Sequence, residues 1–98
     1  MVEPISGSLE LDGWDSEAAV AYEAAVEAIN GVVGAYSALI AQEEQRSDPD
    51  PSAVAEWRRQ RSECQQVRQR IDPDDAAQVD SVRREYAERL RQLHGLIG

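Results

Sequence analysis

The sequence is poor in the residue types that usually carry catalysis. It contains one cysteine, one histidine and no lysine among its 98 residues. His94 has no glutamate or second histidine at the spacing that places metal ligands on one helix face. Cys64 has no histidine near it in the sequence and falls on the apolar side of a helical pattern, which favours a buried structural thiol. We therefore expect no catalytic residue, no metal and no cofactor.

The lone cysteine and the shortage of long apolar runs bear on where the chain works. One cysteine excludes a disulfide within the chain, and a reducing cytoplasm is the simplest expectation. No run of consecutive apolar residues approaches the roughly 20 residues that cross a bilayer. Residues 1–14 lack the basic and apolar segments of a secretion signal. The sequence therefore predicts a cytoplasmic chain with no membrane partner.

Basic residues are scarce, and they are unevenly distributed. Nineteen acidic residues face ten arginines, which gives a net charge of −9. Residues 1–50 hold eleven of the acids and only Arg46, whereas residues 51–98 are close to neutral. This balance argues against binding to nucleic acid, and it permits a basic protein as partner. The arginines of the second half are expected to pair with nearby acids and, across a helical hairpin, with Glu23, Glu27, Glu43 and Glu44.

Apolar residues repeat at helical spacing along most of the chain. From residue 15 to about 46 they alternate at intervals of three and four, which is a heptad pattern, and a similar pattern covers residues 73–94. A weaker pattern covers residues 51–71, because Arg61 falls where an apolar residue would be expected. Because phenylalanine is absent and alanine is abundant, we expect helices around a thin core.

Proline and aspartate mark the ends of these helices. Pro49 and Pro51 cannot continue the first helix, and a loop this short turns the second helix back antiparallel to it. Asp50 is predicted to cap the second helix. Asp72 is predicted to cap the third, with Pro73 as its first residue. The aspartates around these prolines are interpreted as caps because the calcium-loop pattern is missing.

The predicted fold is all-α, an antiparallel helical hairpin or three-helix bundle with helices at residues 15–46, 51–71 and 73–94. Residues 1–14 are expected to form an N-terminal arm beside a single helical domain at residues 15–98. Two arrangements fit: a compact bundle, or a long hairpin in which the second and third helices run nearly end to end. The second arrangement leaves apolar surface uncovered and favours a dimer that forms a larger bundle.

The dipeptide Asn30-Gly31 is a turn signal inside the first predicted helix, and Gly34 follows it. A break there would split the helix, but the heptad spacing keeps its phase from Ile29 to Val33. We therefore predict a continuous helix in which the glycines allow a second backbone to come close. The alternative is that glycine is merely tolerated on an exposed face.

Two hypotheses for the function follow. The first is a non-enzymatic protein–protein interaction module that self-associates or acts as a scaffold through its heptad faces. The residues expected to take part are Tyr22, Val26, Ile29, Gly31, Val33, Gly34, Tyr36, Ile40, Val82, Tyr86, Leu90 and Leu93. The second is an inhibitor of the antitoxin or immunity-protein type, which neutralises a basic partner through Asp12, Asp15, Glu17, Glu23 and Glu27. No small-molecule substrate is evident.

Overall fold

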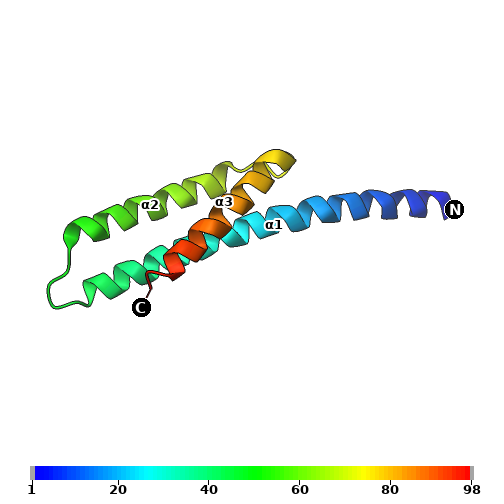
Figure 1. Cartoon of the computed structure of the whole chain (residues 1–98). Coiled ribbons are helices and arrows are strands. Elements are labelled where there is room, and N and C mark those ends of the chain that lie inside the picture. Colours follow the sequence, from blue (N-terminus) through cyan, green and yellow to red (C-terminus); the bar gives the residue numbers. More distant parts are fainter. Residues whose placement is uncertain (1, 98) are drawn as a thin grey trace.

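The chain folds into three helices, as predicted (Figure 1). The computed structural model describes the backbone of residues 2–97 and the side chains of residues 16–97. Helix α1 spans Val2–Glu44, α2 spans Pro51–Arg70 and α3 spans Ala76–His94, and the described residues contain no strand. The all-α three-helix bundle is confirmed.

Helix α1 is the central element of the bundle. Both α2 and α3 lie against it, while no Cα atom of α2 comes within 8 Å of one in α3. The chain reverses after α2, so that α3 runs back along α1 (Figure 1). The compact bundle is therefore the arrangement adopted. The alternative in which α2 and α3 run end to end is not adopted, because the turn between them folds α3 onto α1.

The start of α1 differs from the expected start at residue 15. The helix begins at Val2, and Pro4 falls within its first turn, where a proline removes no backbone hydrogen bond of the helix. The side chains of residues 1–15 lie outside the described part of the chain. The division into an arm at 1–14 and a domain at 15–98 therefore stays a prediction.

The two later helices begin at aspartate caps. The Asp50 carboxylate accepts hydrogen bonds from the backbone N–H groups of Ser52 at 2.9 Å and Ala53 at 3.3 Å, as its predicted role requires. The prediction that α3 starts at residue 73 under an Asp72 cap is wrong. Asp75 is the cap and accepts from the Gln78 N–H at 3.0 Å.

Asp72 instead closes the turn between α2 and α3. Its carboxylate accepts a hydrogen bond from the Asp74 N–H at 2.9 Å. Its backbone C=O accepts another from the Asp75 N–H at 3.1 Å. These two bonds hold the chain in a tight turn. The first hydrogen bond of the helix therefore forms only between the Val79 N–H and the Asp75 C=O. Helix α3 therefore begins three residues later than its proline suggests.

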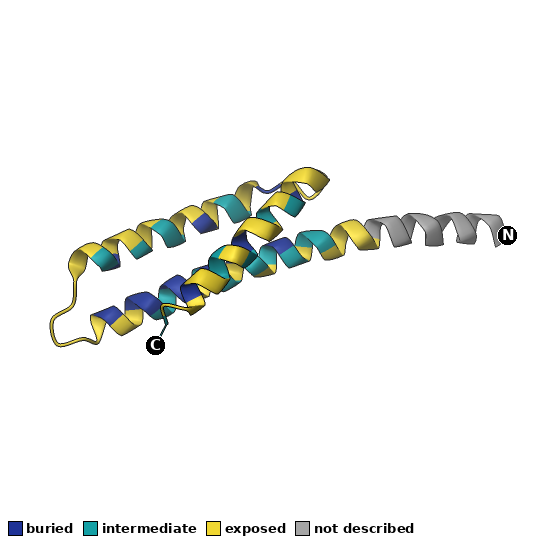
Figure 2. Cartoon of the chain, viewed as in Figure 1, coloured by how far each residue is buried: buried dark blue, intermediate teal, exposed yellow. Residues whose placement is uncertain are grey.

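The core lies along the side of α1 that faces the other two helices (Figure 2). Ile29 and Val32 of α1 and Cys64 of α2 are fully buried. They form one cluster with α3 residues such as Tyr86 and Leu93. A smaller cluster next to the turn between α2 and α3 contains Ala25, Ile71 and Val79.

One stretch of α1, Ser16–Glu44, is long and apolar enough to cross a membrane by length and composition alone. The prediction from the sequence considered only uninterrupted apolar runs, and the absence of a membrane partner stays a prediction. The stretch also supplies α1's share of the core, and a core helix covered on two sides needs the same composition.

Helix α1 is continuous through Asn30-Gly31, as predicted, but Gly31 and Gly34 have different surroundings. A Cβ atom added to Gly31 would lie 2.8 Å from Cδ2 of Leu90, so α3 crosses α1 closely there. A Cβ atom added to Gly34 would meet no atom within 4 Å. Gly31 therefore serves the packing of α3, whereas Gly34 faces solvent.

These surroundings predict opposite results for two alanine substitutions. Gly34→Ala should raise the free energy of unfolding by about 0.5–1 kcal/mol, because alanine favours the helix and meets no neighbour. In Gly31→Ala the same gain is offset, since Leu90 must move. Chemical denaturation of both variants measures the difference. A Gly31→Ala protein stabilised as much as the Gly34→Ala protein would contradict the close crossing.

Candidate interaction surfaces

Most of the heptad residues expected to join two chains are used inside one chain. Ile29, Tyr36, Ile40, Tyr86 and Leu93 are buried in the bundle. The others that remain partly accessible are Tyr22, Val26, Gly31, Val33, Val82 and Leu90, while Gly34 is exposed. The structure thus brings most of the α1 and α3 heptad faces together against each other. Gly34 is the one member that lies fully on the outside.

The acidic residues expected to face a partner do not share one face. The side chains of Asp12 and Asp15 lie outside the described residues. Glu17, Glu23 and Glu27 are all exposed on α1. At 3.6 residues per turn, Glu23 and Glu27 lie about 40° apart around the helix, whereas Glu17 lies about 120° from Glu23. Glu23 and Glu27 form one surface, and Glu17 belongs to another.

The glutamates divide into two groups by their ion pairs. Among the described side chains, each of the six glutamates from Glu43 onward is paired with an arginine; these pairs are Glu43–Arg46, Glu44–Arg58, Glu56–Arg59, Glu63–Arg59, Glu85–Arg89 and Glu88–Arg91. Within the same part of the chain, no arginine pairs with Glu17, Glu23 or Glu27. The expected pairing across the hairpin therefore holds for Glu44 and is wrong for Glu23 and Glu27. Glu43 pairs instead with Arg46, three residues further along the chain.

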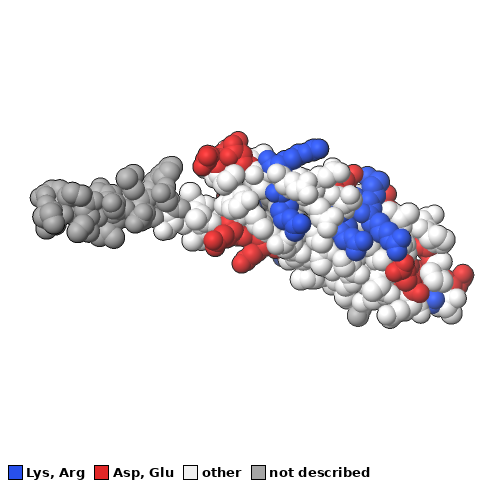
Figure 3. All heavy atoms as spheres, turned by 180° about the vertical axis from the view of Figure 1, so that it is seen from behind, with Lys and Arg blue, Asp and Glu red and all other residues white. Residues whose placement is uncertain are grey.

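Charge is correspondingly segregated along the bundle. The end that contains the turn between α2 and α3 carries seven described acids, namely Glu17, Glu23, Glu27, Asp72, Asp74, Asp75 and Asp80, against the four arginines Arg68, Arg70, Arg83 and Arg84. On the face seen in Figure 3, arginine atoms gather over the middle of the bundle and acidic atoms lie toward its ends. The unbalanced negative charge is therefore concentrated where α1 leaves the other two helices.

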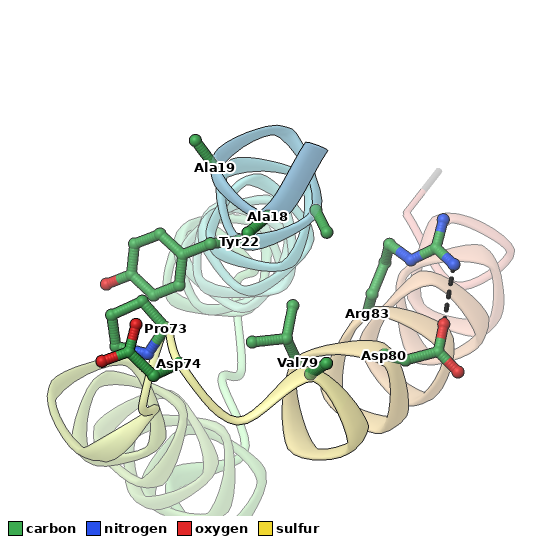
Figure 4. Close-up of a pocket in the computed structure, with 10 residues that line it drawn as sticks. Ala18, Ala19, Tyr22, Pro73, Asp74, Val79, Asp80 and Arg83 are labelled. Carbon is green, nitrogen blue, oxygen red and sulfur yellow. Dashed lines mark hydrogen bonds and ion pairs between the residues drawn. The ribbon is translucent and has the colours of Figure 1, made fainter. Parts of the chain in front are cut away.

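A groove of about 540 Å³ opens at this same end. Its wall on α1 consists of Ala18, Ala19, Ala21 and Tyr22, and its opposite wall is formed by Pro73, Asp74, Ala76, Val79, Asp80 and Arg83. In Figure 4, Tyr22 lies over Pro73 and Asp74, Val79 points toward α1, and Arg83 reaches to Asp80. Most of the lining is apolar and made of small side chains.

Asp80 and Arg83, both on α3, are charged residues at the rim of the groove. Asp80 accepts from Arg83 at 2.8 Å and pairs with Arg84 at 2.9 Å. The hydrogen bond from Arg83 and the charge of Arg84 lower the pKa of the Asp80 carboxyl, which therefore stays ionised. Asp74 lies in the same wall, in the turn before α3, and has no paired arginine among the described side chains. The rim thus offers one neutralised carboxylate and one that is open to a cation.

A second polar cluster lies where the three helices meet. The Arg89 guanidinium lies 4.8 Å from the ring centroid of Tyr86, and its Nη1 is 3.9 Å from Sγ of Cys64. Burial raises the pKa values of the Cys64 thiol and of the Tyr36 and Tyr86 hydroxyls. A buried, protonated thiol is a poor nucleophile. The arrangement fits the structural role expected for Cys64.

These raised pKa values predict a loss of stability in alkali. The folded chain holds the three protons more tightly than the unfolded chain does, so the contribution is complete below the ordinary thiol pKa of 9.0 and declines as the pH rises past it. Denaturation from about pH 8 to about pH 10.5 should show a falling free energy of unfolding. In Cys64→Ala the fall should be smaller. A profile that is unchanged by this substitution would contradict a thiol contribution.

Glu43 is a buried polar residue whose role the sequence did not reveal. It is 9% exposed, and its carboxylate accepts hydrogen bonds from the Asp50 N–H at 2.9 Å and from Arg46 at 3.0 Å. The carboxylate therefore ties the end of α1 to the residue that caps α2. A glutamate near a helix end has no spacing rule that would identify such a contact.

Metal chemistry and similarity to known proteins give no further guide to the site. Among the described residues, no group of three His, Cys, Asp or Glu side chains is placed to hold a metal ion. No protein-family model, no curated protein and no solved structure matches the chain. The groove and the charge distribution are therefore the observations from which a function is argued.

Proposed function

We propose that this chain is a non-enzymatic protein–protein interaction module that works through the exposed end of α1. The observation that carries the proposal is the groove between α1 and the start of α3. Its wall on α1 is rich in alanine, and the side chains of Ala18 and Ala19 are exposed. Open apolar surface next to unpaired acids is typical of a docking site.

The groove is better suited to a polypeptide than to a small molecule. Small-molecule sites are concave and bring a few polar groups together on the ligand. Here the polar groups lie on the rim, and Asp80 is already occupied by two arginines. Alanine side chains let a partner's backbone come close, as happens where helices cross.

Site-specific photo-cross-linking tests this proposal. A photo-reactive residue at Ala19, in the groove wall, should capture a discrete partner from the host's lysate. The same residue at Ala41, exposed near the other end of α1, is the control and should not. Equal capture at both positions, or none at Ala19, would contradict docking at the groove.

A second candidate function is self-association along the outer face of α1. It is favoured by Gly34, whose open side meets no atom of the chain within 4 Å. Glycine within a helix costs about 1 kcal/mol relative to alanine, and the close approach of a second α1 would compensate for it. Sedimentation equilibrium should then show a dimer that Gly34→Leu dissociates. A monomer throughout the micromolar range would eliminate this candidate.

A further inference from the structure

We propose that the groove takes a basic amphipathic helix of a partner protein, an inference that rests on the interaction function proposed above. The helix would place small apolar side chains between α1 and α3 and its Lys or Arg side chains near the unpaired Glu17 and Asp74. Neither the apolar lining nor the acidity alone identifies this partner. The partner is indicated because the apolar lining and the unpaired acids occur at the same end of the bundle.

The charge of the partner is indicated by what the arginines of this chain leave unpaired. Six glutamates outside this end are each paired with an arginine of the same chain. At the groove end, Glu17 lies four residues before Ala21 of the groove wall and so next to it on the face of α1, and Asp74 lies in the opposite wall. Neither is paired with an arginine among the described side chains. Cations from a partner would meet negative charge on both sides of the groove.

The helical shape of the partner is indicated by the lining. The two walls come from α1 and from the start of α3 with the turn before it, so the groove lies where α3 diverges from α1 (Figure 1). Another helix with small side chains is the element that such a space accommodates at close distance. Tyr22 in one wall and Val79 in the other provide larger apolar contacts (Figure 4).

Fluorescence anisotropy with two designed peptides tests the inference on the full chain. One probe is a labelled helical peptide with alanine and leucine on one face and lysine on both flanks. Its twin carries glutamate in place of each lysine. The lysine peptide should bind at least about tenfold more tightly, and added salt should weaken its binding. Equal binding of the twins, or binding that salt does not affect, would overturn the charge argument.

Two variants locate the binding site. Asp74→Arg should weaken the lysine peptide about fivefold. Asp48→Arg makes the same change of charge in the exposed loop at the opposite end of the bundle and should have little effect. Ala18→Trp should block both apolar contact and binding. Equal weakening by the two aspartate variants would show a response to net charge and would overturn the groove as the site.

The two proposals fail in different ways. If neither peptide binds but the photo-reactive residue at Ala19 still captures a partner, the basic helix is wrong and the interaction function stands. If the captured partner is a second copy of this chain, the basic helix is also wrong. If Ala19 captures nothing and neither peptide binds, both proposals fall.

Discussion

Ile29→Ala should lower the free energy of unfolding by about 2–5 kcal/mol. Ile29 is fully buried in the cluster that joins all three helices, so the substitution leaves a cavity that few neighbours can fill. A chain of this size has a total stability of about 5–15 kcal/mol. The melting temperature should fall by about 4–8 °C for each kcal/mol lost. Urea denaturation followed by circular dichroism measures the loss directly.

Val20→Ala is the matched control for this prediction. Val20 also lies on α1 and is 65% exposed, so its truncation removes no buried contact and slightly favours the helix. Its free energy of unfolding should stay within about 0.5 kcal/mol of the original. Similar losses in the two variants would mean that Ile29 does not hold the centre of the core.

Glu43→Ala should cost about 1–3 kcal/mol, because it leaves the Asp50 N–H without the acceptor that now lies 2.9 Å away. It also removes the ion pair with Arg46 at 3.0 Å. That arginine side chain is largely exposed, so the pair itself contributes little. The loss should therefore come mainly from the unsatisfied backbone group at the start of α2.

Two further variants separate these contributions. Glu43→Gln keeps an acceptor oxygen and should recover most of the stability. Arg46→Ala removes only the exposed partner and should cost less than about 1 kcal/mol. A Glu43→Gln protein as unstable as Glu43→Ala would show that the stability comes from the charge of Glu43 and not from its hydrogen bond with the loop.

The helices could be predicted because their signals are local. Heptad spacing and the Pro49–Pro51 boundary depend on neighbours a few residues away, and α2 begins at Pro51 as they indicate. The start of α3 was misplaced because several aspartates in succession can each act as a cap. Only the turn itself selects Asp75 and leaves Asp72 to close the turn.

The irregular position of Arg61 in the α2 pattern shows what local signals miss. An apolar residue is expected there, but Arg61 lies half-buried and donates from Nη1 to Oγ of Ser37 at 3.0 Å. Ser37 in turn donates to the backbone C=O of Val33 at 3.0 Å. The polar residue is thus accommodated by a partner on another helix, which spacing within α2 cannot indicate.

The groove could not be predicted for a related reason. It exists because α1 and α3 diverge, and their crossing is set by contacts such as Leu90 on Gly31 that join residues far apart in sequence. The sequence did indicate acidity in the first half of the chain. It could not separate Glu43 and Glu44, which are paired, from Glu17, Glu23 and Glu27, which are not.

The central position of α1 also has a consequence for how the chain is made. Helix α1 is synthesised before either of the helices that cover it, and it carries the longest apolar stretch of the described chain. At about 5–20 residues per second, the remaining residues take on the order of several seconds to follow. During that interval the face that will become the core has no internal partner. We therefore expect newly made α1 to expose apolar surface of the kind that chaperones protect from aggregation.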